Sequence, residues 1–220
     1  MINNKIILML ILLTVLVITA CNNPEKAFKV EISSNESGEI IITQYLGKEK
    51  EVNIPHKIQN LTVIVIGNFA FFNKNITKVT IPDSVTEIGE YAFACNKLNK
   101  VTIPNSVTKI GDNAFIDNKL TELIIPDSAT KIMARAFAWN KLTKITIHNS
   151  ETEIGSYAFL GNNITSITIP NNVKLGLNAF ARDFNDVYKQ NNRADFNFFY
   201  EQNNRDGGTY RSDLTEWSKE

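Results

Sequence analysis

The chain has few of the residues that most metal and disulfide sites require. Its 220 residues include two cysteines and two histidines, too few soft ligands for a zinc cluster and too few thiols for a disulfide framework. It also lacks a surplus of charge of either sign, because 23 Lys and Arg balance 23 Asp and Glu. Affinity for nucleic acid comes mainly from surplus basic residues that face phosphates. We therefore expect no metal, no cofactor and no nucleic-acid partner.

No apolar run is long enough to form an ordinary membrane span. The longest, Ile6 to Ile18, is interrupted by Thr14 and follows Lys5. A transmembrane helix needs about 20 apolar residues, so this run favours a cleaved export signal. The chain as a whole is 43% hydrophobic and 21% charged, a balance that allows a buried core and excludes a disordered protein.

The residues after this run, Ile18-Thr19-Ala20-Cys21, resemble the bacterial lipobox. The resemblance implies that the Cys21 thiol takes a diacylglyceryl group and that cleavage occurs before it. An ordinary signal peptide with a chance cysteine is the alternative. Two or three acyl chains, at about 0.8 kcal/mol per buried methylene, would anchor the protein stably. We expect an exported protein, lipid-anchored in the bacterial cell envelope, at the outer membrane or cell surface, with the leaflet left open.

The middle of the chain repeats every 22 residues. Five segments follow one pattern, as in IPDSVTEIGEYAF and IPNSVTKIGDNAF, and they begin at Ile81, Ile103, Ile125, Ile147 and Ile169. A less regular copy begins at Ile54. A fixed period of this size, with one small structural unit per period, is the signature of a solenoid.

Within each unit the apolar residues predict one strand and one buried ring. Leu98, Val101 and Ile103 have the L-x-x-L-x-L spacing of a leucine-rich repeat strand, whose last residues alternate with period two. A proline such as Pro104 then ends the strand. The second apolar pair, such as Val107 and Ile110, brings the chain back along the other side. We expect the recurring phenylalanines to stack as an internal column: Phe71, Phe93, Phe115, Phe137, Phe159 and Phe180.

The unit IPxSVTxIGxxAFxxNKLTxVT resembles the BspA-like, treponemal-type leucine-rich repeat of bacterial surface proteins, over about Ile54 to Arg182. The resemblance implies a curved solenoid with a parallel sheet on its concave face, a role in binding proteins or other cells, and no catalytic residues. Four departures put individual turns in doubt: Met133 replaces a glycine, His148 a proline and Glu151 a valine, and the last unit is one residue short.

These features divide the chain into a lipoprotein signal peptide (residues 1–20), a lipidated tether and amino-terminal hairpin cap (21–53), the repeat solenoid (54–182) and a carboxy-terminal cap (183–220). Caps are needed because a solenoid otherwise exposes an apolar stack at each end. Alternation over residues 28–32 and 39–45 predicts the hairpin. The second cap is predicted as a helix with Phe196, Phe199 and Tyr200 on one face, a turn at Gly207-Gly208, and an extended segment over residues 209–211 that leads to Trp217. An aromatic ligand groove is the alternative for this stripe.

The two inner positions of each L-x-x-L-x-L strand point away from the core, onto the concave face. They form the candidate protein-binding surface: Lys78, Thr80, Lys100, Thr102, Glu122, Ile124, Lys144, Thr146, Ser166 and Thr168. Three lysines against one glutamate suit an acidic protein or glycan, although threonine and lysine also suit any exposed strand face. Ile124 is the exception, an apolar residue in a polar column that could anchor a partner.

Other candidates are weaker. His148 could serve as a base for Ser150 or Ser156, but no orienting acid stands at a defined spacing. Cys95 occupies a variable turn position and is expected to be a plain thiol. Asn96, Asn118, Asn140 and Asn162 suit turns with positive φ or hydrogen bonds to loop backbone. We therefore expect a monomeric binding protein without catalysis, or alternatively a structural envelope lipoprotein without a host ligand.

Overall fold

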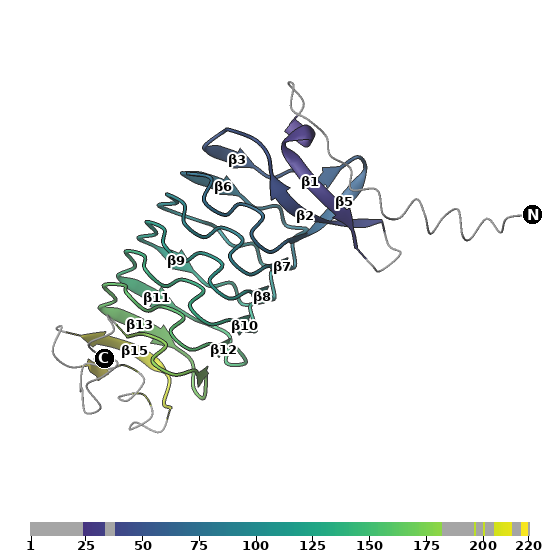
Figure 1. Ribbon diagram of the computed structural model, residues 1–220. Coiled ribbons are helices and arrows are strands. Elements are labelled where there is room, and N and C mark those ends of the chain that lie inside the picture. Colours follow the sequence, from purple (N-terminus) through teal and green to yellow (C-terminus); the bar gives the residue numbers. More distant parts are fainter. Residues whose placement is uncertain are drawn as a thin grey trace, which may run out of the picture.

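The computed structural model describes residues 24–33, 38–181, 205–212 and 217–219, together with Phe196 and Tyr200. The protein is a solenoid whose turns stack along one axis, with two sheets on opposite sides (Figure 1). Several predictions concern residues outside this range: the signal peptide and Cys21, the turn over residues 34–37, and most of the carboxy-terminal helix, Phe199 included.

The L-x-x-L-x-L segments form the first sheet, which we call the L sheet. Its strands β9 (Leu123–Ile124), β11 (Lys144–Thr146) and β13 (Ser166–Ile169) pair in parallel, each residue beside its equivalent 22 positions away. β6 (Lys78–Thr80) pairs instead with β3 (Glu51–Asn53). The segment between β6 and β9, which starts at Leu98, joins the sheet through a single bridge from Lys100 to Glu122. Four of the five predicted strands therefore exist and form a sheet in two parts, whereas residues 98–103 contribute only this bridge and no strand.

A second and longer sheet runs along the other side. The strands that extend it are only two residues each: β7 (Glu87–Ile88), β8 (Lys109–Ile110), β10 (Lys131–Ile132), β12 (Glu153–Ile154) and β14 (Lys174–Leu175). They pair in parallel and continue from β5 (Leu61–Ile66), which also pairs with β2 (Glu39–Tyr45) and with the short β4 (Lys57–Ile58). The sequence predicted only that the chain returns along this side, and not that it forms a sheet there.

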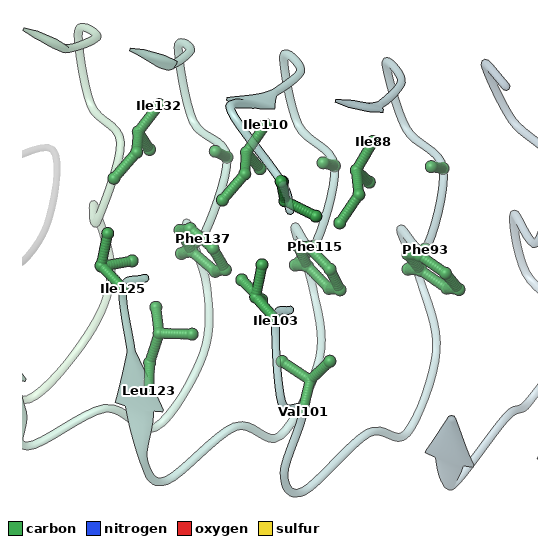
Figure 2. Packing of buried hydrophobic residues seen from close by; sticks show 14 of the residues in the cluster. Ile88, Phe93, Val101, Ile103, Ile110, Phe115, Leu123, Ile125, Ile132 and Phe137 are labelled. Atoms are coloured by element: carbon green, nitrogen blue, oxygen red, sulfur yellow. The ribbon is translucent and has the colours of Figure 1, made fainter. Parts of the chain in front are cut away.

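The core between the sheets is the predicted phenylalanine column. Successive rings from Phe71 to Phe180 stack with their centroids 4.9–5.6 Å apart. Figure 2 shows Phe93, Phe115 and Phe137 between the isoleucines of the second sheet and the apolar residues of the L segments. Rings at 5 Å exclude water from the interior and hold the turns at one spacing.

Aromatic residues cover both ends of this column. At the amino-terminal end, the short 3-10 helix η1 (Pro24–Ala27) leads into β1 (Phe28–Ile32), which pairs antiparallel with β2 where the hairpin is predicted. The ring of Tyr45 stacks on Phe71 at 5.2 Å, and Phe28 meets Phe71 edge-on.

At the other end, Phe196 meets Phe180 edge-on at 5.2 Å and packs against Tyr200 and Tyr210. Phe196 and Tyr200 are helical. β15 (Gly208–Ser212) pairs antiparallel with β13, and β16 (Trp217–Lys219) pairs with β15. Gly208 is thus the first residue of a strand rather than part of a turn.

The sequence departures change single turns and leave the stack intact. Met133 makes the same backbone hydrogen bond as the glycines at the equivalent positions. Its N–H donates to Ile110 O at 2.9 Å, as Gly111 N–H does to Ile88 O at 2.8 Å. In the turn after His148, the buried position moves from residue 151 to residue 152. Glu151 is exposed as a result, whereas Thr152 is buried and donates its hydroxyl to Ala129 O.

Candidate binding face

The structure places the predicted binding residues on one surface. Thr80, Thr102 and Ile124 lie on the outer side of the L sheet, as do the lysines of the same strands, while the alternate residues Val79, Val101 and Leu123 are buried. The strand alternation therefore separates the core from this surface as the sequence indicates. No described contact tests whether a partner uses it.

The L sheet is hollowed where its pairing is interrupted. Among the described residues, no strand pairing joins β6 to the segment around Lys100 and Thr102. A groove of about 510 Å³ lies at this break, lined by Lys78, Thr80, Lys100 and Thr102, with Asp83 at its rim. A second groove of about 200 Å³ adjoins it, shares Lys100 and Thr102, and is bordered by Glu122 and Ile124. The two grooves form one depression, lined by both apolar and polar side chains, beside the exposed Ile124.

The surplus of positive charge on this surface is smaller than the columns predict. Glu51, on a strand outside the five regular repeats, lies 3.8 Å from Lys78, and Glu122 lies 3.7 Å from Lys100. Counting Lys78, Lys100 and Lys144 against these two glutamates leaves one positive charge. All four paired side chains are largely exposed, so each pair contributes little to stability. Each lysine can therefore leave its glutamate and pair with another acidic group.

Ile124 is the most exposed large apolar residue of the described chain. Its exposed fraction is 73%, and its neighbours in the column are Thr102 and Thr146. Its side chain is not needed by the core, since Leu123 and Ile125 fill that role. An exposed isoleucine beside a groove is the arrangement from which interface anchors are built.

The carboxy-terminal end of the predicted surface is less open. Ser166 pairs with Arg211, and Thr168 with Thr209, in the β13–β15 ladder. The hydroxyl groups of Thr168 and Thr209 are 3.1 Å apart and share a hydrogen bond. Thr146, Ser166 and Thr168 are only half-exposed, so the accessible part of the surface extends from Lys78 to Lys144.

The weaker candidates do not form a catalytic group in the described chain. His148 is exposed and makes no hydrogen bond with Ser150 or Ser156, and the Ser156 hydroxyl accepts from Leu177 N–H at 3.2 Å. Burial raises the pKa of the half-buried Cys95 thiol, and the Asp117 carboxylate raises that pKa further. A thiol with a raised pKa is a poor nucleophile at neutral pH.

The asparagines make the loop hydrogen bonds that the sequence allowed. Asn96, Asn118, Asn140 and Asn162 are buried and bonded to backbone. The positive φ belongs to the residue before each of them, for example 56° at Cys95 and 55° at Asp117.

Sequence reasoning missed an exposed aromatic cluster at the turns that follow β5 and β7. It consists of Phe69, Phe72 and Tyr91, which we call the aromatic cluster. The departure from the repeat pattern could have revealed it, because Phe72 stands where later repeats carry Ala94, Ile116 and Ala138.

The stacked 22-residue turns, each carrying one L-x-x-L-x-L segment, define a leucine-rich repeat protein. Within this class the chain belongs to the BspA type leucine-rich repeat family, whose model matches residues 64–185 in six copies. Solenoids of this class commonly present extended surfaces to protein partners.

A solved structure supports the fold. A leucine-rich repeat protein of T. pallidum is similar, with a TM-score of 0.54 and 21% identity over 74% of this chain and 89% of that chain. A leucine-rich cell surface protein of Faecalibacterium prausnitzii A2-165 matches at 24% identity, with a TM-score of 0.35 over 69% of this chain and 56% of that chain. A comparison with curated proteins gave no match.

Among the described residues, no helix has both the length and the hydropathy of a membrane span. The same residues contain no group of three or more His, Cys, Asp or Glu side chains that could hold a metal ion.

Proposed function

We propose that the protein is a lipid-anchored envelope protein that binds other proteins or cell surfaces through the outer side of the L sheet. The observation that supports this most directly is the depression between Lys78 and Ile124, where the sheet pairing is interrupted and an isoleucine is exposed. Binding would involve recognition without chemistry.

The partner we propose is a protein surface that offers an apolar pocket to Ile124 and polar groups to the groove. Thr102 and the unpaired edge of β6 supply hydrogen-bonding groups along the groove. Lys78 and Lys100 can turn from their glutamates toward acidic groups of the partner, since exposed pairs are weak. The anchor would be the acylated Cys21, as the lipobox resemblance implies.

Ile124→Thr tests the binding surface with little risk to the fold, because threonine is the residue of the same column. The mature chain would first be used to isolate a partner from cell-surface and matrix proteins, and the affinity of the variant would then be measured. We expect binding about tenfold weaker, since truncating an interface anchor costs more than about 1 kcal/mol. The double variant Ile124→Glu with Lys100→Glu should abolish binding.

Ile32→Thr is the matched control, because Ile32 is also an exposed isoleucine, at 55%, but lies at the amino-terminal end. It should bind as the unaltered chain does. All variants should keep nearly the same melting temperature, since exposed substitutions change stability by about 0.5 kcal/mol or less. Unaltered binding by the double variant would exclude this surface.

Protease treatment of intact cells separates surface display from a periplasmic structural role. Digestion of the mature protein on intact cells supports display. Protection on intact cells, with digestion after permeabilisation, would favour the alternative of a structural lipoprotein without a host ligand.

A further inference from the structure

The aromatic cluster lies at the amino-terminal end of the solenoid, on the side of the second sheet. Phe69 is 49% exposed and Phe72 is 39% exposed. The rings of Phe69 and Tyr91 stack at 5.0 Å, and Phe72 meets them edge-on at 5.8 and 6.3 Å. Glu90 and Asp112 border the cluster, because their backbone carbonyls accept from Phe69 N–H and Tyr91 N–H. The three rings themselves form an apolar patch.

The fold does not require aromatic side chains at these positions. Phe69 and Tyr91 have φ values of 58° and 51°, in the left-handed region that disfavours bulky residues. Later repeats carry different residue types at this position, with φ values of 56°, 54°, 60° and 48°: Asn113, Arg135, Tyr157 and Asn178. Asparagine tolerates this region well, so the turn does not depend on an aromatic ring.

Phe72 is also unlike its equivalents. Ala94, Ala138 and Leu160 occupy the same place in later repeats and are fully buried. The first repeat alone thus presents a large, exposed ring at this position. Packing of the solenoid accounts for neither the size nor the exposure of this cluster, which suggests a contact outside the chain.

The cluster lies close to the point where the described chain begins. Leu46 N–H donates to Ala27 O, and Tyr45 N–H donates to Ala70 O. Ala27 is therefore two hydrogen-bonded neighbours away from Ala70, or about 10 Å at the usual spacing of about 4.8 Å. The ring of Phe28 also contacts that of Phe71, at 6.2 Å between centroids. Phe69 and Phe72 flank the Ala70-Phe71 pair.

The chain between Cys21 and Ala27 is short. Six residues span at most about 22 Å when fully extended, and η1 shortens this because a 3-10 helix rises only about 2.0 Å per residue. If Cys21 is acylated, Ala27 lies within about 20 Å of the bilayer that holds the acyl chains. The nearby aromatic cluster is then within reach of the headgroup region, where amphipathic aromatic rings are favoured.

We propose that the aromatic cluster rests in the interfacial region of the membrane to which Cys21 is attached. This inference depends on the lipid anchor of the proposed function. The two sheets lie on opposite sides of the solenoid (Figure 1). A membrane contact at the turns after β5 and β7 therefore leaves the L sheet turned away from the bilayer, with its grooves open to partners.

Tryptophan quenching tests the contact in the acylated chain. Trp139 and Trp217 are changed to Phe, and Phe72→Trp is reconstituted into phosphatidylcholine vesicles with or without brominated acyl chains. We expect the brominated lipid to quench the fluorescence at position 72. Leu177→Trp is the matched control, because Leu177 is 62% exposed at the corresponding turn of the last repeat, and its fluorescence should be the same in both vesicles. Equal fluorescence at position 72 in both vesicles would overturn the inference.

A spin label tests the same membrane contact without altering any aromatic residue. Asn73→Cys in a Cys95→Ser background is suitable because Asn73 and Cys95 occupy equivalent positions, with φ values of 53° and 56°. We expect a nitroxide at position 73 to be shielded from a water-soluble relaxation agent, whereas one at Leu177→Cys is not.

Co-sedimentation of the chain with the vesicles separates the two proposals. A chain that fails to co-sediment contradicts the lipid anchor, and the inference with it. A chain that co-sediments but shows neither quenching nor shielding retains the anchor and contradicts only the membrane contact.

Discussion

At the scale of single residues, the buried asparagines specify the turns most tightly. Each links its own repeat to the one before it. The Asn118 amide donates to Phe93 O and Phe115 O at 2.9 and 3.2 Å, while its oxygen accepts from Leu98 N–H at 3.1 Å. Phe93 O also accepts from Asn96. The asparagines therefore form an interlocked ladder that satisfies backbone groups no strand reaches.

Asn118→Ala should lower the free energy of unfolding by about 1–3 kcal/mol. The Phe93 and Phe115 carbonyls keep the amides of Asn96 and Asn140, but Leu98 N–H is left buried without an acceptor, a loss of about 1–3 kcal/mol. Urea denaturation measures the change. Asn105→Ala, at an exposed position, should leave stability nearly unaltered, and an equal effect of both variants would contradict the ladder.

At the scale of elements, the two sheets differ in how well the sequence predicts them. The L-x-x-L-x-L segments alternate over enough residues to predict strands, and β6, β9, β11 and β13 lie there. The strands that extend the second sheet through the repeats, such as β7, β8 and β10, have two residues each, too few for a period to be read. They exist because neighbouring turns bring identical backbone segments together, which is a property of the stack and not of one repeat.

The second sheet also depends on glycines that follow its strands. A Cβ on Gly111 would lie 2.7 Å from the Gly89 carbonyl carbon and 2.8 Å from the Glu90 nitrogen. A side chain at position 111 would therefore crowd backbone atoms that cannot rotate away, although the turn after β10 accommodates Met133 at the equivalent position.

We expect Gly111→Ala to destabilise the protein by about 1–3 kcal/mol, the usual effect of overpacking. Thermal unfolding followed by circular dichroism measures it. Lys119→Ala, exposed in the same repeat, serves as the control. A melting temperature of Gly111→Ala that equals the control value would show that the turns can separate without loss.

At the scale of the whole molecule, the sequence predicts which residues face outward but not the shape of the surface they form. Ile124 and the lysines could be assigned to the outer side of a strand from alternation alone. The grooves could not, because they depend on the missing pairing between β6 and the next repeat. The ion pair of Lys78 with Glu51 could not be predicted from the sequence either, since Glu51 belongs to a strand outside the regular repeats.

Deletion of one complete repeat, residues 98–119, separates the fold from the proposed binding surface. Each repeat contacts mainly its neighbours, so Phe93 can stack on Phe137 and Asn140 can take the place of Asn118. We expect a folded chain with the same type of circular dichroism spectrum and a smaller denaturant m-value, because less surface is buried. Partner binding should fall, since Lys100 and Thr102 and the grooves they line are removed.

Deletion of half a repeat, residues 98–108, is the control. It shifts every later residue by half a turn, places polar side chains in the core and should give an unfolded chain. If both deletions unfold the protein, the repeats are not interchangeable units. If the 22-residue deletion folds and still binds with full affinity, the contact lies elsewhere on the solenoid, because a stack of equivalent turns keeps its core when one is lost but not a surface made by that turn.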